Sequence, residues 1–354
     1  LEATIVPRAG YPLRFIRVGG IAGKAWSVRL ANALRIPVGT VQSMSLVMRE
    51  GARVVVGVGG YASGPVVLAA KLLRRRTLVL EQNAAPGSTN RILAPLVDRV
   101  AVAFPGTARR LPGRVVVTGN PVRSGLSAVP DRRVAEVRRL LIFGGSRGAR
   151  GLNDAVMEAL PLLEIGDVPL EILHQTGPAD EKRVQAAYGR TGLDARVVPY
   201  IDDMAGAYAG ADLVLCRAGA TTVAELSAVG RAAIMVPLPH ATGGHQEENA
   251  REMADCGAAI LLRQSDAGSG RLAGLILELL EDAGRRQRME EAARGLGSPG
   301  AAAAVADIVL ELYDGELRRS AARNGRPASD SAGPVAFTWW GSGAPACAAS
   351  PRSS

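Results

Sequence analysis

Short hydrophobic runs that end in glycine or polar residues alternate along the chain with longer segments of helical pattern, and this alternation constrains the fold most. The run RVVVGVGG (53–60) is followed by SGPVVLAAKLL (63–73), in which Pro65 stands in the first turn of a predicted helix. Proline is tolerated there because the first helical N–H groups have no intrahelical partner. Strands and helices in regular alternation form parallel sheets with helical crossovers, so the sequence predicts an α/β protein.

The alternation occurs in two series separated by a charged connector. The first series ends with RVVVTGNP (114–121), and the second runs from RRLLIFGG (138–145) to GAAILLRQ (257–264). We therefore predict two Rossmann-like, doubly wound parallel-sheet domains facing a cleft, over 1–125 and 126–290. In such sheets ligands bind beyond the carboxyl ends of the strands, so the residues that follow each strand are the candidates for function.

The C-terminal part of the chain is predicted to consist of a helix followed by a disordered tail. Residues 291–313 are expected to form a helix that returns to the N-terminal domain. The stretch 314–354 is rich in Ser, Ala, Gly and Pro and shows no periodicity. Such composition is typical of chains that cannot bury a core, so we expect this tail to be disordered.

Composition narrows the class of partner. The net charge of +9 favours anionic partners. Nucleic acid is not favoured, because the basic residues are scattered and aromatic residues make up only 4% of the chain. Phosphorylated small molecules and phospholipid surfaces fit better. The three cysteines are far apart without metal-ligand spacing, which indicates a reduced, cytoplasmic setting, and no run of about 18 apolar residues predicts a membrane span.

The stretch FGGSRGA (143–149) places Gly144, Gly145 and Ser146 directly after a predicted strand. Glycines allow a ligand to approach the backbone, and the start of the next helix offers N–H groups to an anion. The stretch matches neither GxGxxG nor the GK[ST] of a Walker loop, so it does not support a dinucleotide or ATP site. It is either a phosphate or sugar site or a tight structural turn.

The stretch LCRAGATTVAEL (215–226) makes the same transition from strand to helix. We expect Thr221 or Thr222 to cap the helix and Glu225 to lie in its first turn. There Glu225 could simply complement the helix dipole, or its carboxylate could accept hydrogen bonds from the hydroxyls of a ribose. Arg217 could hold an anion or support the loop.

Two further stretches are unusually polar. EQNAAPGSTNR (81–91) follows a buried strand, and its Glu81, Asn83 and Asn90 indicate a functional loop. In HATGGHQEEN (240–249), two glycines between the histidines exclude a helical HExxH metal site. Gln246 and Asn249 share one helix face and could reach a sugar together.

The ordered set GVGGYASGP, EQNAAPGSTNR, VTGNPVR, FGGSRGARGLN, HQTG, YIDDMAGAYAGADLVLCRAGATTVAEL and HQEENA resembles glycosyltransferase family 28, the N-acetylglucosaminyltransferases that convert lipid I to lipid II in peptidoglycan synthesis. The resemblance covers about residues 1–314. It implies a GT-B fold, inversion at the anomeric carbon, and no metal or other cofactor. It also implies UDP-N-acetylglucosamine as donor, lipid I (undecaprenyl-pyrophosphoryl-MurNAc-pentapeptide) as acceptor, and a peripheral location on the cytoplasmic face of the plasma membrane.

The resemblance also assigns roles to residues. It places Arg123 and Ile201 at the uracil, Ser146 at a phosphate, and Glu225 at the ribose. The complete substrate-binding set that it implies is Asn83, Arg123, Ser146, Ile201, Ala220, Thr221, Thr222, Val223, Ala224, Glu225, Gln246 and Asn249. It places Tyr61, Glu81 and Asn90 on the acceptor side, as the catalytic candidates. It assigns Asn153 and Arg217 as supports of the loops.

The sequence departs from the family at its start. Chains of this family begin with a strand and a Gly-rich loop, roughly TGGTGGH, whose histidine is a candidate general base, and nothing like it precedes the segment that begins at Leu1. We therefore expect the first strand–loop–helix unit to be missing. A catalytically impaired remnant that still binds the sugar nucleotide is an alternative, as is another GT-B lipid glycosyltransferase or a UDP-N-acetylglucosamine epimerase.

The segment GKAWSVRLANALRIPVGTV (23–41) mixes apolar and basic residues, and KLLRRR (71–76) follows in the next predicted helix. Basic residues near anionic lipid contribute about 1 kcal/mol each, and apolar side chains can enter the interface. We therefore expect an anionic phospholipid surface as a partner of this domain. The alternative is that the apolar positions belong to the core.

Overall fold

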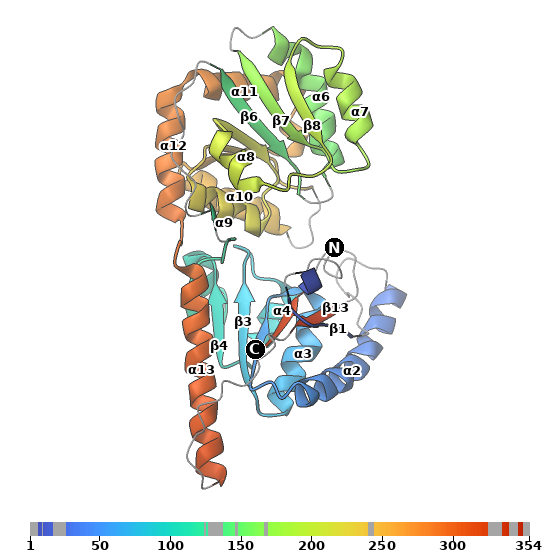
Figure 1. Cartoon of the computed structure of the whole chain (residues 1–354), viewed down its shortest axis with the longest axis vertical. Helices are drawn as coiled ribbons and strands as arrows, with labels where there is room; N and C mark the ends of the chain where they lie inside the picture. The colour runs from blue at the N-terminus through green and yellow to red at the C-terminus, as the bar shows by residue number, and fades with distance from the viewer. Residues whose placement is uncertain are drawn as a thin grey trace. The chain divides into compact units, whose positions relative to one another are not determined.

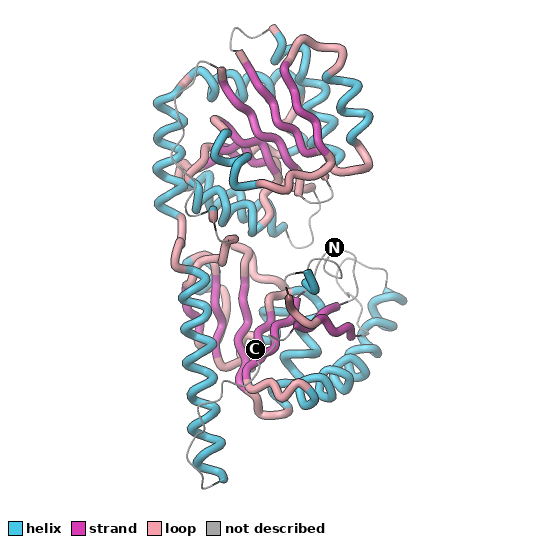
Figure 2. The backbone as a smooth tube through the Cα atoms, viewed as in Figure 1, coloured by secondary structure: helices cyan, strands magenta, loops and turns pink. Residues whose placement is uncertain are grey.

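The structure is a computed structural model of the chain (Figure 1). It describes residues 6–8, 10–16, 26–123, 125–126, 137–145, 148–165, 169–239, 244–324, 335–339 and 346–349. Two compact units are formed, unit 1 from Leu1–Gly119 with Gly300–Ser354 and unit 2 from Asn120–Pro299. Each unit contains one sheet flanked by helices, as the magenta strands and cyan helices of Figure 2 show, so the predicted α/β class is confirmed.

The sheet of unit 1 has the strand order β1-β13-β12-β2-β3-β4-β5. Strands β2 to β5 pair in parallel, as the run of hydrophobic segments predicts. The strands are β1 (Leu13–Ile16), β2 (Val54–Gly57), β3 (Arg76–Glu81), β4 (Arg99–Val102), β5 (Val115–Val117), β12 (Val335–Trp339) and β13 (Ala346–Ala349). Every residue of β2 is buried, as expected for a strand covered on both faces.

Different helices cover the two faces of this sheet. On one face Val55 and Val79 pack with residues of α2 (Trp26–Arg49) and α3 (Gly60–Leu72). On the other, Val54 and Val56 pack with α13 (Ala301–Asn324). The faces alternate with residue number because successive side chains of a strand point to opposite sides. The short helices α4 (Ser88–Leu93) and α5 (Pro105–Ala108) follow β3 and β4.

The C-terminal region is more regular than the disordered tail that we predicted from residue 314. Helix α13 continues to Asn324, β12 pairs in parallel with β2, and β13 pairs antiparallel with both β12 and β1. The prediction failed there because low periodicity hides a short strand. VAFTW is a β-branched and aromatic run with high strand propensity, and pairing satisfies the backbone groups along the other edge of β2.

Unit 2 contains a six-stranded sheet of order β11-β10-β9-β6-β7-β8, and all its pairs are parallel. The strands are β6 (Arg138–Phe143), β7 (Leu170–Gln175), β8 (Asp194–Val198), β9 (Leu213–Cys216), β10 (Ala233–Met235) and β11 (Ala259–Leu261). The main core joins β6, β7, β9 and β10 to three helices on one face, α6 (Arg150–Glu164), α7 (Glu181–Tyr188) and α11 (Ser269–Glu281). The remaining helices are α8 (Met204–Gly210), α9 (Ala220–Val229), α10 (His245–Asp255) and α12 (Ala283–Leu296), with a short 3-10 helix at Gln264–Asp266.

One helical stretch of the described residues, Ala283–Arg318, is long and apolar enough to cross a membrane by length and composition alone. This is weak evidence, because core helices of soluble proteins pass the same test. In α13, Val305, Ile308, Val309 and Leu312 are buried against the sheet of unit 1. Core packing therefore accounts for these four residues, whereas Leu310 of the same helix is 58% exposed.

Asp98, just before β4, joins the amino ends of β3 and β4. Its carboxylate accepts hydrogen bonds from the Thr77 N–H at 3.0 Å, the Thr77 hydroxyl at 2.9 Å and Arg76 Nη1 at 2.9 Å, and Lys71 Nζ lies 3.4 Å away. Burial alone would raise the pKa of Asp98, but the bonds from Arg76 and Thr77 and the charge of Lys71 outweigh it. The pKa therefore lies below its ordinary value of 3.8.

We expect Asp98→Asn to lower the free energy of unfolding by about 1–3 kcal/mol at pH 7, because it removes charge-assisted hydrogen bonds. The folded-state pKa is depressed, so this stabilisation is complete above the unfolded-state pKa and is lost as pH falls through the folded-state value. Urea unfolding at pH 7 and near pH 3 should show the difference from wild type shrinking at the lower pH. Asp307→Asn, at an exposed position of α13, is the control; a D98N effect that does not depend on pH would contradict the assignment.

Candidate functional site

Three neighbouring strands of unit 2 end at the same edge of the sheet. Because β6, β9 and β10 are adjacent and parallel, their last residues Phe143, Cys216 and Met235 lie side by side. The loops that follow them start at Gly144, Arg217 and Val236, which places the glycine loop and the start of α9 next to each other. The glycine loop, the start of α9 and the loop after β10 therefore lie at one edge of the sheet.

The glycine loop after β6 is held against the end of β7. Gln175 Nε2 donates to the carbonyl of Gly145 at 2.9 Å. Gly148 has a φ of +75°, and a Cβ at this position would lie 1.9 Å from the carbonyl oxygen of Thr176. Ser146, the predicted phosphate contact, lies outside the described residues. Gln175 was not among the predicted site residues, although the HQTG motif contains it.

Asn153 of α6, expected as a support of the loops, bonds to the residue that follows β7. Its side-chain nitrogen donates to the Thr176 carbonyl at 3.0 Å and to Asp180 at 2.9 Å, and its amide oxygen faces His174 Nε2 at 3.2 Å. An amide oxygen can only accept, so Nε2 carries the proton and Nδ1 accepts from the Tyr188 hydroxyl at 3.1 Å. Burial lowers the pKa of His174 to about 3, which keeps this packed histidine neutral at physiological pH.

The start of α9 differs from its prediction. Gly219 is the N-cap residue, no side chain caps the helix, and Thr221 and Thr222 lie within its first turn. Neither threonine can cap because the helix already begins at Ala220. The first intrahelical bond runs from the Val223 N–H to the Gly219 carbonyl at 3.0 Å. The N–H groups before it point out of the helix end, where they favour an anion.

Glu225 lies in the second turn of α9, not in the first, and its side chain is 3% exposed. The interpretation as a surface carboxylate that complements the helix dipole is therefore wrong. Tyr208 donates its hydroxyl to Glu225 Oε2 at 3.0 Å, and Arg123 Nε lies 3.5 Å from Oε1. Oε1 is buried and accepts no hydrogen bond from the described residues. Burial raises the pKa of Glu225 above its ordinary value, and the charge of Arg123 and the bond from Tyr208 oppose that shift only in part.

Arg217, for which support of the loops was one expectation, bonds to backbone carbonyls of a neighbouring loop. It is 5% exposed, and its Nη1 donates to the carbonyls of Val236 and Pro237, both at 3.0 Å. Its Nη2 donates to Gln264 Oε1 at 2.6 Å. Arg217 therefore connects the loop after β9 to the loop after β10.

The two predicted sugar contacts of α10 have different surroundings. Asn249 is fully buried and donates its side-chain amide to the Ala218 carbonyl at 3.1 Å, so it fixes the loop before α9. Gln246 is half-buried, and its Oε1 accepts from the Leu238 N–H at 2.9 Å. That bond turns the Gln246 oxygen toward the loop after β10. Ile201, in the loop after β8, is buried.

In unit 1, Glu81 organises the loop that follows β3. Glu81 is 3% exposed. Its Oε1 accepts hydrogen bonds from the backbone N–H of Asn83 at 2.9 Å and from the side-chain amide of Asn83 at 3.2 Å. Its Oε2 accepts hydrogen bonds from the Gly87 N–H and from Asn90 Nδ2, both at 2.8 Å. Four donors around one buried carboxylate argue against Glu81 as a general base. The amide oxygen of Asn90 is buried and accepts no hydrogen bond within the described part of the chain. The side chain of Tyr61 lies outside the described residues.

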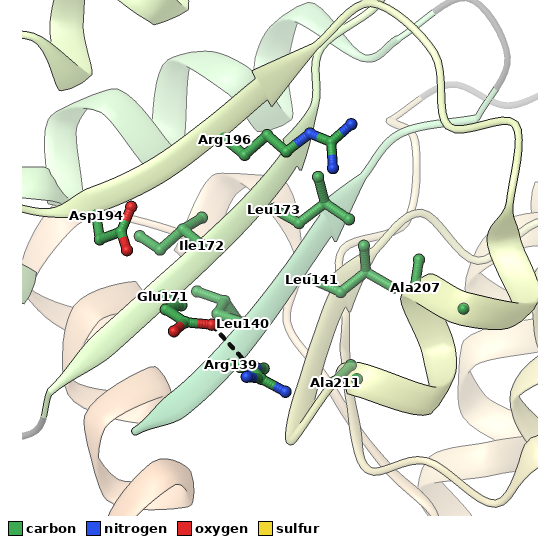
Figure 3. A pocket seen from close by; sticks show the side chains of 12 residues that line it. Arg139, Leu140, Leu141, Glu171, Ile172, Leu173, Asp194, Arg196, Ala207 and Ala211 are labelled. Atoms are coloured by element: carbon green, nitrogen blue, oxygen red, sulfur yellow. Dashed lines mark hydrogen bonds and ion pairs between the residues drawn. The ribbon is translucent and has the colours of Figure 1, made fainter. Parts of the chain in front are cut away.

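Figure 3 shows a pocket of unit 2 that lies away from this site. It is lined by the amino-terminal halves of β6, β7 and β8, with Arg139, Glu171, Asp194 and Arg196 around an apolar floor, and α8 beside it. Arg139 Nε pairs with Glu171 at 2.8 Å. The pocket carries two charges of each sign and lies at the opposite ends of the strands from the glycine loop.

Two glycines of the loop after β6, Gly145 and Gly148, allow a test of its packing. We expect Gly148→Ala to destabilise unit 2 by several kcal/mol, because the new Cβ meets the Thr176 carbonyl. Gly145 also has a positive φ, but a Cβ there meets nothing within 4 Å, so Gly145→Ala should cost only the strain of about 1–2 kcal/mol. Urea unfolding of both variants measures the difference, and equal losses would contradict the close approach.

Comparisons with known proteins agree with this arrangement. The sequence matches the glycosyltransferase family 28 N-terminal domain over residues 1–102 and the family 28 C-terminal domain over residues 139–309. A similar protein is the UDP-N-acetylglucosamine–N-acetylmuramyl-(pentapeptide) pyrophosphoryl-undecaprenol N-acetylglucosamine transferase of Anaeromyxobacter sp. (strain K). The two sequences are 46% identical over 315 residues, and this alignment covers 88% of this chain and 82% of that protein. The transferase of the same name from Myxococcus xanthus (strain DK1622) is 44% identical over 317 residues, with coverage of 88% and 82%. The crystal structure of MurG from Acinetobacter baumannii matches with a TM-score of 0.73 and 34% identity, over 88% of each chain.

Proposed function

The chain belongs to glycosyltransferase family 28, and we propose that it transfers N-acetylglucosamine from UDP-N-acetylglucosamine to lipid I, giving lipid II. The fold is GT-B. The acceptor atom is the C4 hydroxyl oxygen of the muramyl sugar, and the reaction inverts the anomeric carbon. The observation that carries the proposal is the buried Glu225 carboxylate close behind the start of α9, which no side chain caps. Its Oε1 accepts no hydrogen bond from the described residues.

This geometry suits a nucleoside diphosphate. The free N–H groups at the start of α9 and the backbone of the neighbouring glycine loop can stabilise the negative charge of the departing diphosphate. The Glu225 carboxylate can accept a hydrogen bond from a ribose hydroxyl. Stabilisation of the leaving group by backbone N–H groups requires no metal ion. The C4 hydroxyl still requires a base within hydrogen-bond reach, and the contacts of Glu81 argue that it is not this base.

The remaining donor contacts are assigned by resemblance to the family. Arg123, whose side chain is 57% exposed and beside Glu225, would contact the uracil together with the backbone of Ile201. Ser146 would meet a phosphate. Gln246 would hold the N-acetylglucosamine hydroxyls, whereas Asn249 would act by fixing the loop at Ala218. The segment from Ala220 to Glu225 would line the nucleotide.

The acceptor-side assignment concerns the loops of unit 1. Asn83 would contact the sugar nucleotide, and Tyr61, Glu81 and Asn90 would line the acceptor side. The amide oxygen of Asn90 supports this assignment, because it is buried and accepts no hydrogen bond from the residues that the structure describes, so a ligand could supply the donor. Glu81 would act there by holding Asn83 and Asn90 in place.

A peripheral position on the cytoplasmic face of the plasma membrane follows from the lipid-linked acceptor. Val38, Val41 and Met48 of α2 are exposed by 53–63% and lie on one helix face. Lys71 and Arg74 lie at the end of α3, which packs on α2. We propose that this surface binds anionic phospholipid. The side chains of Trp26, Val28, Leu30 and Leu34, expected to contribute, lie outside the described residues.

The donor assignment predicts that Glu225→Gln raises the KM for UDP-N-acetylglucosamine about 10–100-fold, because a charged acceptor becomes a neutral one. The assay measures formation of lipid II from a lipid I analogue, together with titration of the donor. Glu278→Gln, an exposed carboxylate of α11, is the control and should leave KM unchanged. An unchanged KM in E225Q would refute the ribose contact, and binding of the donor without any transfer by the wild type would favour the sugar-nucleotide-binding remnant.

For the membrane surface, we expect the double variant Val38→Glu, Val41→Glu to lose at least tenfold in affinity for vesicles containing anionic phospholipid at low salt, because two carboxylates face the interface. Sedimentation with vesicles measures binding. The control is Ile165→Glu in unit 2, at a position that is 77% exposed. If wild type does not bind such vesicles, or the control falls equally, this surface is not the membrane contact.

A further inference from the structure

Tyr208 has a structural position that points to a role in the reaction. It lies in α8, 17 residues before Glu225, and its side chain is fully buried. Its hydroxyl donates to Glu225 Oε2 at 3.0 Å, a bond between two buried groups of different elements. The family resemblance assigned no role to this tyrosine.

The ring and backbone of Tyr208 are fixed from several sides. Its ring meets Phe143, the last residue of β6, edge to face at 6.0 Å between centroids. Its carbonyl accepts from Arg231 Nε at 2.9 Å, and Arg231 is itself fully buried. Helix α8 is capped by Asp203, whose side chain accepts from the Gly206 N–H at 2.9 Å. The hydroxyl therefore occupies a defined position before any ligand binds.

This bond makes the two oxygens of Glu225 unequal. Oε2 is bound to Tyr208, whereas Oε1 is buried, lies 3.5 Å from Arg123 Nε, and accepts no hydrogen bond from the residues that the structure describes. Without the tyrosine hydroxyl the carboxylate could rotate about its last torsion, which is broad for glutamate. Burial and the charge of Glu225 raise the pKa of Tyr208 well above its ordinary value, so its hydroxyl remains a donor.

We propose that Tyr208 is a positioning residue that orients the Glu225 carboxylate so that Oε1 accepts a hydrogen bond from the ribose of the uridine nucleotide. The inference rests on the proposed function, because it requires a ribose at Glu225. A residue that acts in this way affects recognition of the ribose hydroxyls and leaves recognition of the uracil and the diphosphate unchanged. A tyrosine that serves stability alone has no such selectivity.

The test compares UDP with 2′,3′-dideoxyuridine diphosphate, which lacks both ribose hydroxyls, by isothermal titration calorimetry of the full chain. Tyr208→Phe removes the hydroxyl and keeps the ring against Phe143. We expect it to weaken UDP about tenfold and the dideoxy compound by less than twofold. In the transfer assay the KM for UDP-N-acetylglucosamine should rise by a similar factor while kcat stays within about twofold. In the background of Glu225→Gln, adding Tyr208→Phe should have no further effect on UDP affinity.

Tyr188→Phe is the matched control, because it also removes a buried tyrosine hydroxyl in unit 2, one bonded to His174. It should leave the ratio of the two affinities as in wild type, whatever it does to the melting temperature. Equal losses for both compounds in Y208F, or no loss for either, would overturn the proposal. If wild type binds both compounds equally well, the ribose contact of Glu225 itself fails, which separates failure of the proposed function from failure of this inference.

Discussion

The parallel pairing of strands is the constraint on which the rest of the structure depends. Adjacent parallel strands end at the same edge of the sheet. The loops that follow β6, β9 and β10 therefore lie side by side, although they are distant in sequence. The glycine loop, the start of α9 and the loop after β10 are adjacent for this reason. Side chains beneath the edge, above all Arg217 and Gln175, then fix the loops through bonds to backbone carbonyls.

Buried charge is used at this site in two distinct ways. Glu81 and Arg217 have their polar groups largely occupied by neighbouring loops, and such groups hold backbone in place. Glu225 is buried to a similar degree, but one of its oxygens accepts no hydrogen bond from the described part of the chain. Burying a carboxylate is costly unless it is paired, and the charge of Arg123 and the hydroxyl of Tyr208 offset that cost only in part. An incompletely satisfied buried carboxylate is suited to a ligand that supplies the missing donor.

Much of the fold could be predicted because its signals are local. Hydrophobic runs such as RVVVGVGG and RRLLIFGG locate strands and glycine turns directly, and the order of the motifs indicated the family. Details that depend on tertiary contacts were missed. Helix α9 begins at Ala220, so its N-cap residue is Gly219 and not a threonine. Sequence patterns do not locate the first residue of a helix this closely. The burial of Glu225, the four donors of Glu81 and the bond from Tyr208 depend on the packed structure. The strands near the C-terminus pair with β2 and β1, which are distant in sequence.

The pairing of β12 with β2 has a consequence for the time at which each unit can fold during synthesis. The two strands are roughly 280 residues apart, and α13 also joins unit 1 from the far side of unit 2. Unit 2 is one unbroken stretch of chain, so it can become compact while the ribosome is still producing the C-terminal segments. The pairing of β12 with β2 must wait for them. The sheet of unit 1 is thus completed only after the whole of unit 2 has been synthesised.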